Sequence, residues 1–187
     1  MNLPNKLTLL RIFLTILFVF LLFSKAEGMM PAALGVFLFA AITDYWDGKI
    51  ARQRGEITPL GQLMDPIADK LLTLSAYISF VQMGILPAWM VIVIIARDVL
   101  ITGLRLSIPQ GRSQKTEPRQ SGKHKTALQI SSIIGVLIFL AVQESPAWRP
   151  EWTPTALLFI YYGMFLIVAV TVWSGVRYLV KNRGCFG

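Results

Sequence analysis

The sequence predicts an all-α integral membrane protein with six transmembrane helices, formed by a single domain over residues 1–187. Hydrophobic residues make up 55% of the chain and charged residues only 15%, with a mean hydropathy of +0.60, which is too apolar for an ordinary soluble protein. Apolar runs close to the roughly 17 to 25 residues needed to cross a bilayer recur along the chain. These runs lie near 7–23, 31–47, 67–82, 87–104, 127–142 and 155–180.

The first apolar run has two possible explanations. Lys6 and Arg11 precede most of it, and Ser24-Lys25-Ala26 closes it in the manner of a signal-peptidase site. Because five further apolar runs follow, a retained membrane anchor is the better interpretation. We expect its first residues to form a short N-terminal helix that lies in the membrane interface. The absence of an Arg- and Ser-rich leader favours the plasma membrane of a bacterium over an organelle.

Basic residues divide the connections between the apolar runs into two unequal sets. The two termini and the second and fourth connections together hold 14 Lys and Arg residues, whereas the opposite connections hold only Lys25 and Arg149. By the positive-inside rule, this distribution predicts that both termini and these two connections face the cytoplasm. The fourth connection, 105–126, is polar enough to predict a solvated linker. A nucleic-acid partner is excluded, because the basic residues flank apolar helices and lack interleaved aromatic residues.

The second apolar run ends in acidic and small residues. At about 100° per residue, Asp44, Asp47, Gly48, Ala51 and Arg52 share one face of a helix. A helix normally presents Leu and Ile on such a stripe. Since Gly48 costs about 1 kcal/mol of helix propensity, the pattern favours a large ligand lying against the backbone.

A second acidic face follows on the third apolar run. Gly61, Asp65 and Asp69 recur every four residues and span about 80° of a helix. Pro66 directly after Asp65 predicts a helix that begins here, with Asp65 as its N-terminal cap and Pro66 in the first helical position. This structural role would explain Asp65, but it leaves Asp69 unexplained.

The four carboxylates of these faces predict a site for two divalent cations. Together they would repel one another, and an Asp in the middle of a transmembrane helix costs about 2.5 to 3.5 kcal/mol on insertion scales. Oxygen ligands without His or Cys select Mg²⁺ or Mn²⁺ before Zn²⁺, and the single His124 and single Cys185 supply no alternative ligand set. Such a site is typical of phosphoryl transfer, in which two metals hold a pyrophosphate. A small metal or proton transporter is the alternative, but it predicts acidic residues spread across the bilayer.

This spacing resembles the signature of the CDP-alcohol phosphotransferase family. The matching positions are Asp44, Asp47, Gly48, Ala51, Arg52, Gly61, Asp65 and Asp69. The resemblance implies a six-helix membrane fold over the whole chain, a homodimer, and an enzyme that displaces CMP from a CDP-linked lipid by attack of a second alcohol. It implies that Asp44, Asp47 and Asp65 are the main metal ligands. Asp69 would lie near the second metal and act as general base for the incoming hydroxyl.

The resemblance implies a site for the CDP group, and the basic residues of the fourth connection favour a second site for an anionic acceptor. The CDP group would be bound by Asn5, Thr8, Gly48, Ala51, Arg52 and Gly61. The phosphate of an anionic acceptor would be bound by Arg105, Arg119, Lys123 and Lys125.

Two further segments resemble the bacterial phosphatidylglycerophosphate synthase branch of that family. They are the run from Ser121 to Gln129 and the Arg97-Asp98 pair. They imply CDP-diacylglycerol and sn-glycerol 3-phosphate as substrates, with inositol phosphate as the alternative acceptor, and an active site that faces the cytoplasm among membrane lipids. For Arg97-Asp98, an ion pair that closes the end of the fourth helix and a substrate contact both remain open.

Overall fold

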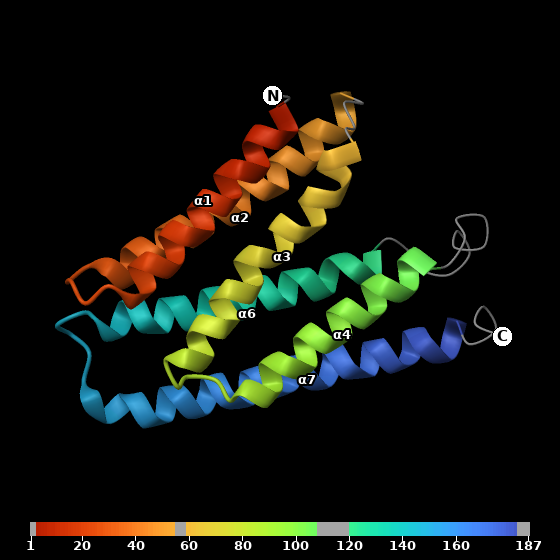
Figure 1. Ribbon diagram of the computed structural model, residues 1–187. Coiled ribbons are helices and arrows are strands. Elements are labelled where there is room, and N and C mark those ends of the chain that lie inside the picture. The colour runs from red at the N-terminus through yellow and green to blue at the C-terminus, as the bar shows by residue number, and fades with distance from the viewer. Residues whose placement is uncertain (1–2, 55–58, 108–119, 183–187) are drawn as a thin grey trace.

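The computed structural model is entirely helical over the residues that it describes (Figure 1). It describes the backbone of residues 3–54, 59–107 and 120–182, and side chains within 9–43, 70–101, 103 and 127–180. The helices are α1 (Leu3–Phe23), α2 (Met29–Arg54), α3 (Pro59–Gln82), α4 (Ala88–Ser107), α6 (Gln120–Gln143), the 3₁₀ turn η1 (Pro150–Trp152) and α7 (Thr153–Asn182). In the described ranges, the expected all-α fold with six helices is confirmed.

Successive helices run in alternating directions, so that their ends gather at two opposite ends of the bundle. The starts of α1, α3 and α6 and the ends of α2, α4 and α7 lie toward one end, which we call the basic end (Figure 1). The connections 24–28, 83–87 and 144–149 lie toward the other, which we call the turn end. This alternation agrees with the two sets of connections into which the basic residues fall.

The core lies where α1, α2, α3 and α6 meet. α1 packs against α2 and α3, α2 packs against α6, and α7 covers α4 and α6. Phe18 of α1 and Phe37 of α2 are fully buried, with ring centroids 5.5 Å apart. Phe80 of α3 and Leu137 of α6 are also fully buried in this core. Burial of these large apolar side chains fixes the helices against one another.

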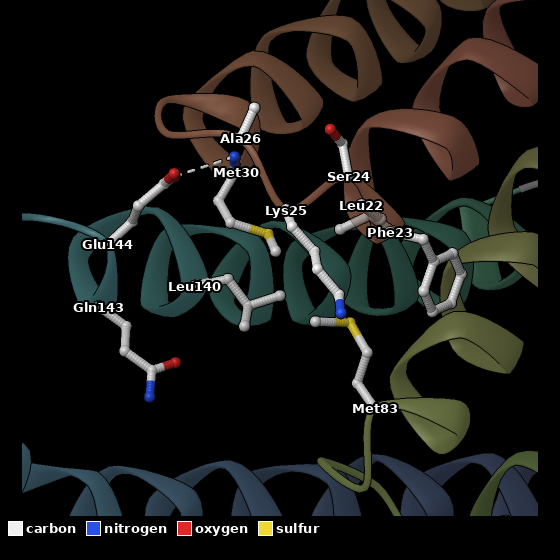
Figure 2. A pocket seen from close by; sticks show the side chains of 10 residues that line it. All are labelled: Leu22, Phe23, Ser24, Lys25, Ala26, Met30, Met83, Leu140, Gln143 and Glu144. Carbon is white, nitrogen blue, oxygen red and sulfur yellow. Dashed lines mark hydrogen bonds between the residues drawn. The ribbon is translucent and has the colours of Figure 1, made fainter.

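The turn end is closed by glycine turns and one carboxylate. Gly28 and Gly84 have positive φ angles of 79° and 72°, which side chains other than glycine rarely adopt. Glu144, just beyond α6, accepts hydrogen bonds from the backbone N–H groups of Gly28 at 2.6 Å and Met30 at 3.0 Å (Figure 2). A carboxylate at a helix N-terminus satisfies free N–H groups and interacts favourably with the helix dipole. Glu144 therefore ties α6 to the start of α2.

Large apolar side chains also cover the outside of the bundle. Phe159, Leu166 and Trp173 form one stripe on α7 and are 75%, 66% and 73% exposed. Such a surface is costly in water and is suited to lipid. Among the described residues, the segment Pro150–Val180 is the one helix long and apolar enough to cross a membrane. Shorter apolar helices cover Leu9–Phe23, Met29–Thr43 and Ala127–Gln143.

The start of α3 differs from the expectation. The helix begins at Pro59, so Asp65 is not an N-terminal cap and Pro66 lies inside the helix. Pro59 is well suited to the first turn of the helix, because a backbone N–H at that position would have no partner within the helix. Pro66 then removes one hydrogen bond from the helix interior.

Two further expectations about local structure are wrong. No separate interfacial helix precedes the first apolar run, because α1 is continuous from Leu3 to Phe23. Pro4 does not interrupt α1, since it lies in the first turn. The expected linker 105–126 is helical at both ends, because α4 continues to Ser107 and α6 begins at Gln120, while its middle, 108–119, lies outside the described residues.

The variant Glu144→Gln tests the contact between α6 and α2. It keeps the shape of the side chain but removes the charge from the two bonds to backbone N–H groups. We expect a loss of about 1 kcal/mol in the free energy of unfolding, which lowers the Tm in detergent by about 2 to 4 °C. An unchanged Tm would contradict the proposed tie between these helices.

Candidate active site

The acidic residues predicted to bind metal lie on two helices joined by a short connection. Asp44 and Asp47 belong to α2, and Asp65 and Asp69 belong to α3; the structure describes their backbone, while their side chains lie outside its described part. Both segments are helical, as the predicted shared faces require. The connection from Arg54 to Pro59 allows a separation of at most about 18 Å between the helix ends.

The helix bounds also set the depth of these residues. Asp44 lies ten residues before Arg54, and Asp69 lies ten residues after Pro59. At 1.5 Å per residue, each is about 15 Å from the connection. Because α3 turns back from the end of α2 (Figure 1), the two positions lie at the same level of the bundle. Asp47 and Asp65 form a second level nearer the connection.

This arrangement fits the divalent cations predicted from the sequence. Four carboxylates at two levels of two helices that are joined by a short connection are the oxygen donors that Mg²⁺ and Mn²⁺ prefer. Among the side chains that the structure describes, no group of three or more His, Cys, Asp or Glu residues is placed to hold a metal ion. The aspartates of α2 and α3 lie outside those described side chains and stay the metal ligands predicted from the sequence.

The residues predicted to bind substrate occupy the basic half of the helices. Asn5 and Thr8 lie in α1, Gly48, Ala51 and Arg52 in α2, and Gly61 in α3. Arg11 follows Thr8 by three residues and is only 8% exposed, so this part of α1 turns a cation toward the interior. Of the predicted acceptor-binding residues, Arg105 lies in α4, and Lys123 and Lys125 lie in α6. Arg119 lies outside the described residues.

A group of polar side chains, which we call the polar cluster, joins three helices next to Asp69. Lys70 Nζ of α3 lies 2.7 Å from Asp98 Oδ2 of α4. Arg97 Nη1 donates to Asp98 Oδ1 at 3.0 Å, and Gln129 Nε2 of α6 donates to Asp98 Oδ2 at 3.3 Å. Asp98 is therefore an acceptor for two cations and one amide.

Tyr77 adds a second polar contact between α3 and α6. Its hydroxyl lies 2.9 Å from Ser132 Oγ and 3.4 Å from the Gln129 carbonyl oxygen. Ser132 Oγ already donates to that carbonyl at 2.7 Å. Because the Ser132 proton is already donated, the Tyr77 hydroxyl is the donor in its bond to Ser132 Oγ. Tyr77 is 2% exposed, so this contact belongs to the core.

Arg97 also defines how closely α7 approaches α4. A Cβ added to Gly175 of α7 would stand 3.2 Å from Arg97 Cγ. The Arg97 side chain is 15% exposed, and its buried Nε has no hydrogen-bond partner among the described residues. The Arg97 side chain thus packs against α7 at position 175, where only glycine leaves enough space for it.

These contacts revise the reading of Arg97-Asp98. The pair does not close the end of α4, because the helix continues for nine residues beyond Asp98. Asp98 instead bonds to Gln129, which the sequence pattern grouped with it, and to Lys70. Lys70, Tyr77 and Ser132 were missed as members of a site. A charged Lys70 inside an apolar run was the signal that could have identified it.

Two surface hollows occur elsewhere, at the turn end. One, of about 430 Å³, lies beneath the connection between α1 and α2 and includes Lys25, Met83 and Glu144 (Figure 2). The other, of about 600 Å³, lies between the connection 83–87 and the start of α7 and includes Leu86 and Tyr161. Neither contains a predicted site residue, so we do not assign the activity to them.

Comparisons with known proteins cover nearly the whole chain. The family model for CDP-alcohol phosphatidyltransferase matches residues 1–180. A Bacillus subtilis protein named CDP-diacylglycerol–glycerol-3-phosphate 3-phosphatidyltransferase is 37% identical, over 97% of this chain and 95% of its own length. Proteins of the same name from Pseudomonas fluorescens and Escherichia coli K12 are 34% and 30% identical. They match 96% and 97% of this chain and 89% and 95% of their own lengths.

Two alanine variants on α7 test the close approach of Arg97. Alanine favours a helix over glycine by about 1 kcal/mol. Gly163 has nothing within 4 Å of an added Cβ, whereas Gly175 has Arg97 Cγ at 3.2 Å. We therefore expect Gly163→Ala to raise the Tm and Gly175→Ala to leave it unchanged or lower it. Equal gains in Tm would show that Arg97 does not occupy the surface at Gly175.

Proposed function

The chain belongs to the CDP-alcohol phosphatidyltransferase family, and from this premise we propose that it transfers the phosphatidyl group of CDP-diacylglycerol to sn-glycerol 3-phosphate. The products are phosphatidylglycerophosphate and CMP. One observation carries the proposal: relatives named for this reaction match at least 96% of the chain at 34 to 37% identity. The acidic residues at matching depths on α2 and α3 provide the chemistry that such a transfer requires.

The reaction is a direct displacement at phosphorus. The hydroxyl oxygen of glycerol 3-phosphate forms a bond to the phosphorus that carries diacylglycerol. The bond from this phosphorus to the oxygen bridging to CMP breaks, and CMP leaves. Asp69 accepts the proton of the attacking hydroxyl, because a carboxylate held beside that oxygen can act as general base.

The aspartates of α2 and α3 would hold the metals and, through them, the pyrophosphate. Asp44, Asp47 and Asp65, with Asp69, would bind two Mg²⁺ or Mn²⁺ ions. When bound, these ions neutralise the pyrophosphate and the charge that develops on the departing CMP. The aspartates fix the position of that charge, so that the substrate phosphorus lies in line with the attacking oxygen.

The small and basic residues of the basic end would select the substrates. Gly48, Ala51 and Gly61 leave space for CDP against the backbone, and Arg52 pairs with its phosphates. Asn5 and Thr8 contribute from α1. Arg105, Arg119, Lys123 and Lys125 bind the phosphate of the acceptor.

The proposal places this enzyme in the plasma membrane of a bacterium, with six spans and both termini and the active site at the cytoplasmic side. Supporting observations are the length and apolarity of Pro150–Val180, the exposed apolar stripe on α7, and the excess of Lys and Arg at the basic end. Family resemblance adds a homodimer, which light scattering of the detergent-purified protein tests directly.

A CMP-release assay with a panel of acceptors tests the proposed function. Purified protein is mixed with CDP-diacylglycerol, Mg²⁺ or Mn²⁺ and one acceptor at a time. Release with glycerol 3-phosphate alone supports the proposal. Release with inositol phosphate but not with glycerol 3-phosphate would keep the chemistry and change the acceptor. No release with any acceptor, together with transport of the cation into vesicles, would favour a transporter.

The variant Asp69→Asn tests the general base. It keeps the shape of the side chain and removes its ability to take a proton. General-base catalysis contributes about 10²- to 10⁴-fold, so we expect kcat to fall by at least about 10²-fold with little change in Tm. Glu151→Gln is the matched control, because Glu151 lies in η1 at the turn end. Full activity of Asp69→Asn would remove Asp69 from this role.

Lys123→Gln tests acceptor binding. A lost bond between a cation and a phosphate costs about 1.5 to 3 kcal/mol, so we expect the KM for glycerol 3-phosphate to rise by at least about tenfold. The KM for CDP-diacylglycerol should stay within twofold of wild type. A uniform loss for both substrates would instead indicate a role of Lys123 in folding.

A further inference from the structure

We infer that Asp98 is a positioning residue: through Lys70 it fixes the rotation of α3 and thereby the placement of the aspartates that bind metal. This inference rests on the proposed function for its meaning in catalysis. It concerns the three helices that the polar cluster joins, and it gives Asp98 a role other than the substrate contact that the sequence leaves open for Arg97-Asp98.

The first argument is the register of α3. Lys70 directly follows Asp69 in the chain, and its ammonium group is 2.7 Å from Asp98 Oδ2. Tyr77 lies seven residues further on, which places it within about 20° of Lys70 around the helix axis. Tyr77 contacts Ser132 of α6. Two polar anchors on one stripe of α3 therefore hold that stripe against α4 and α6.

The acidic positions lie on the other side of the same helix. Relative to Lys70, positions 69, 65 and 61 lie about 100°, 140° and 180° around the axis. α3 packs against α1 as well as against α4 and α6. Holding Lys70 at Asp98 therefore turns the positions of Asp65 and Asp69 away from α4. A rotation of α3 by one residue would bring Asp69 into the place of Lys70.

The second argument is the charge at Asp98. Lys70 and Arg97 both donate to this one carboxylate, and the Asp98 and Arg97 side chains are each 15% exposed. Removing the negative charge would leave two cations without their shared partner. The cost is larger for Arg97, whose side chain is 15% exposed, than for Lys70, whose side chain is 40% exposed. Gln129 would lose its acceptor as well. One substitution thus loosens α3, α4 and α6 together.

The alternative role is contact with the acceptor phosphate. Lys70 and Arg97 carry suitable charges, but both already bond to Asp98 at 2.7 and 3.0 Å. A phosphate would have to compete with this carboxylate. The contacts therefore favour positioning, and the kinetic constants distinguish the two roles. Loss of a substrate contact raises the KM, whereas misplacement of the catalytic aspartates lowers kcat.

The experiment compares full-length wild type with Asp98→Asn, Lys70→Gln and the double variant. Glu144→Gln is the matched control, because Glu144 also joins separate helices by hydrogen bonds but lies at the turn end. The first readout needs no substrate: the Tm is measured as Mn²⁺ is added. The second is CMP release, which gives kcat and the KM for glycerol 3-phosphate.

We expect Mn²⁺ to raise the Tm of wild type, and Asp98→Asn to raise the Mn²⁺ concentration of half-maximal effect by about tenfold. A misplaced catalytic group lowers kcat by about 10- to 100-fold, while the KM stays within about twofold. The double variant should be no worse than Asp98→Asn, since the two residues act as a unit. Glu144→Gln should lower the Tm but leave the Mn²⁺ response and kcat within about twofold of wild type.

Several results would overturn the inference. They are a loss of Tm in Asp98→Asn with unchanged Mn²⁺ response and kcat, a rise in KM alone, or the absence of any Mn²⁺ effect on wild type. If Asp98→Asn does not fold, Lys70→Gln decides by the same readouts, because it leaves the bonds from Arg97 and Gln129 to Asp98 in place. If wild type responds to Mn²⁺ but releases no CMP with any acceptor, the proposed function fails, and the Mn²⁺ comparison still tests Asp98.

Discussion

The carboxylate of Asp98 is the polar interaction that joins α3, α4 and α6 within the apolar core. A largely buried cation needs a partner, and Asp98 is the partner of Arg97, whose side chain is 15% exposed, and also of Lys70, whose side chain is 40% exposed. Because Lys70 follows Asp69 directly, satisfying this cation also sets the face of α3 on which the acidic positions lie. In the proposed enzyme, paired charge at Lys70 and a fixed position of the metal ligand Asp69 would both depend on neighbouring residues of one helix turn.

The two ends of the bundle divide structural and chemical tasks between them. At the turn end, Glu144 accepts bonds from the backbone where α2 begins, and glycines at 28 and 84 close tight turns. These contacts hold helices together without a residue of the predicted site. Nearer the basic end, the polar cluster around Asp98 joins α3, α4 and α6. Phe18 and Phe37 pack against each other in the apolar core of the bundle.

The sequence predicted what depends on local pattern. Apolar runs of bilayer length gave the number and order of the helices, and acids within such runs stood out because they are costly there. The helix limits were less predictable, since α2 continues to Arg54 after its apolar run has ended, and α3 begins at Pro59 rather than Pro66. The hydropathy of the sequence changes where these apolar runs end or begin, but the backbone hydrogen bonding of the helices continues past those residues. The bonds from Lys70 and Gln129 to Asp98 join residues 28 and 31 positions apart, and no local periodicity reports such partners.

The balance of charge explains why this chain combines acidic faces with a net charge of +8. In the proposed site, two divalent cations would balance the four carboxylates of α2 and α3, leaving no surplus positive charge for the substrates. The pyrophosphate of CDP-diacylglycerol and the phosphate of the acceptor would then need cations from elsewhere in the chain. Lys70 and Arg97 can supply little of this, because Asp98 already engages both. The residues left for that task are those near the basic end, namely Arg52 and the cations of α4 and α6. The concentration of Lys and Arg at one end of the bundle therefore serves substrate binding as well as membrane orientation.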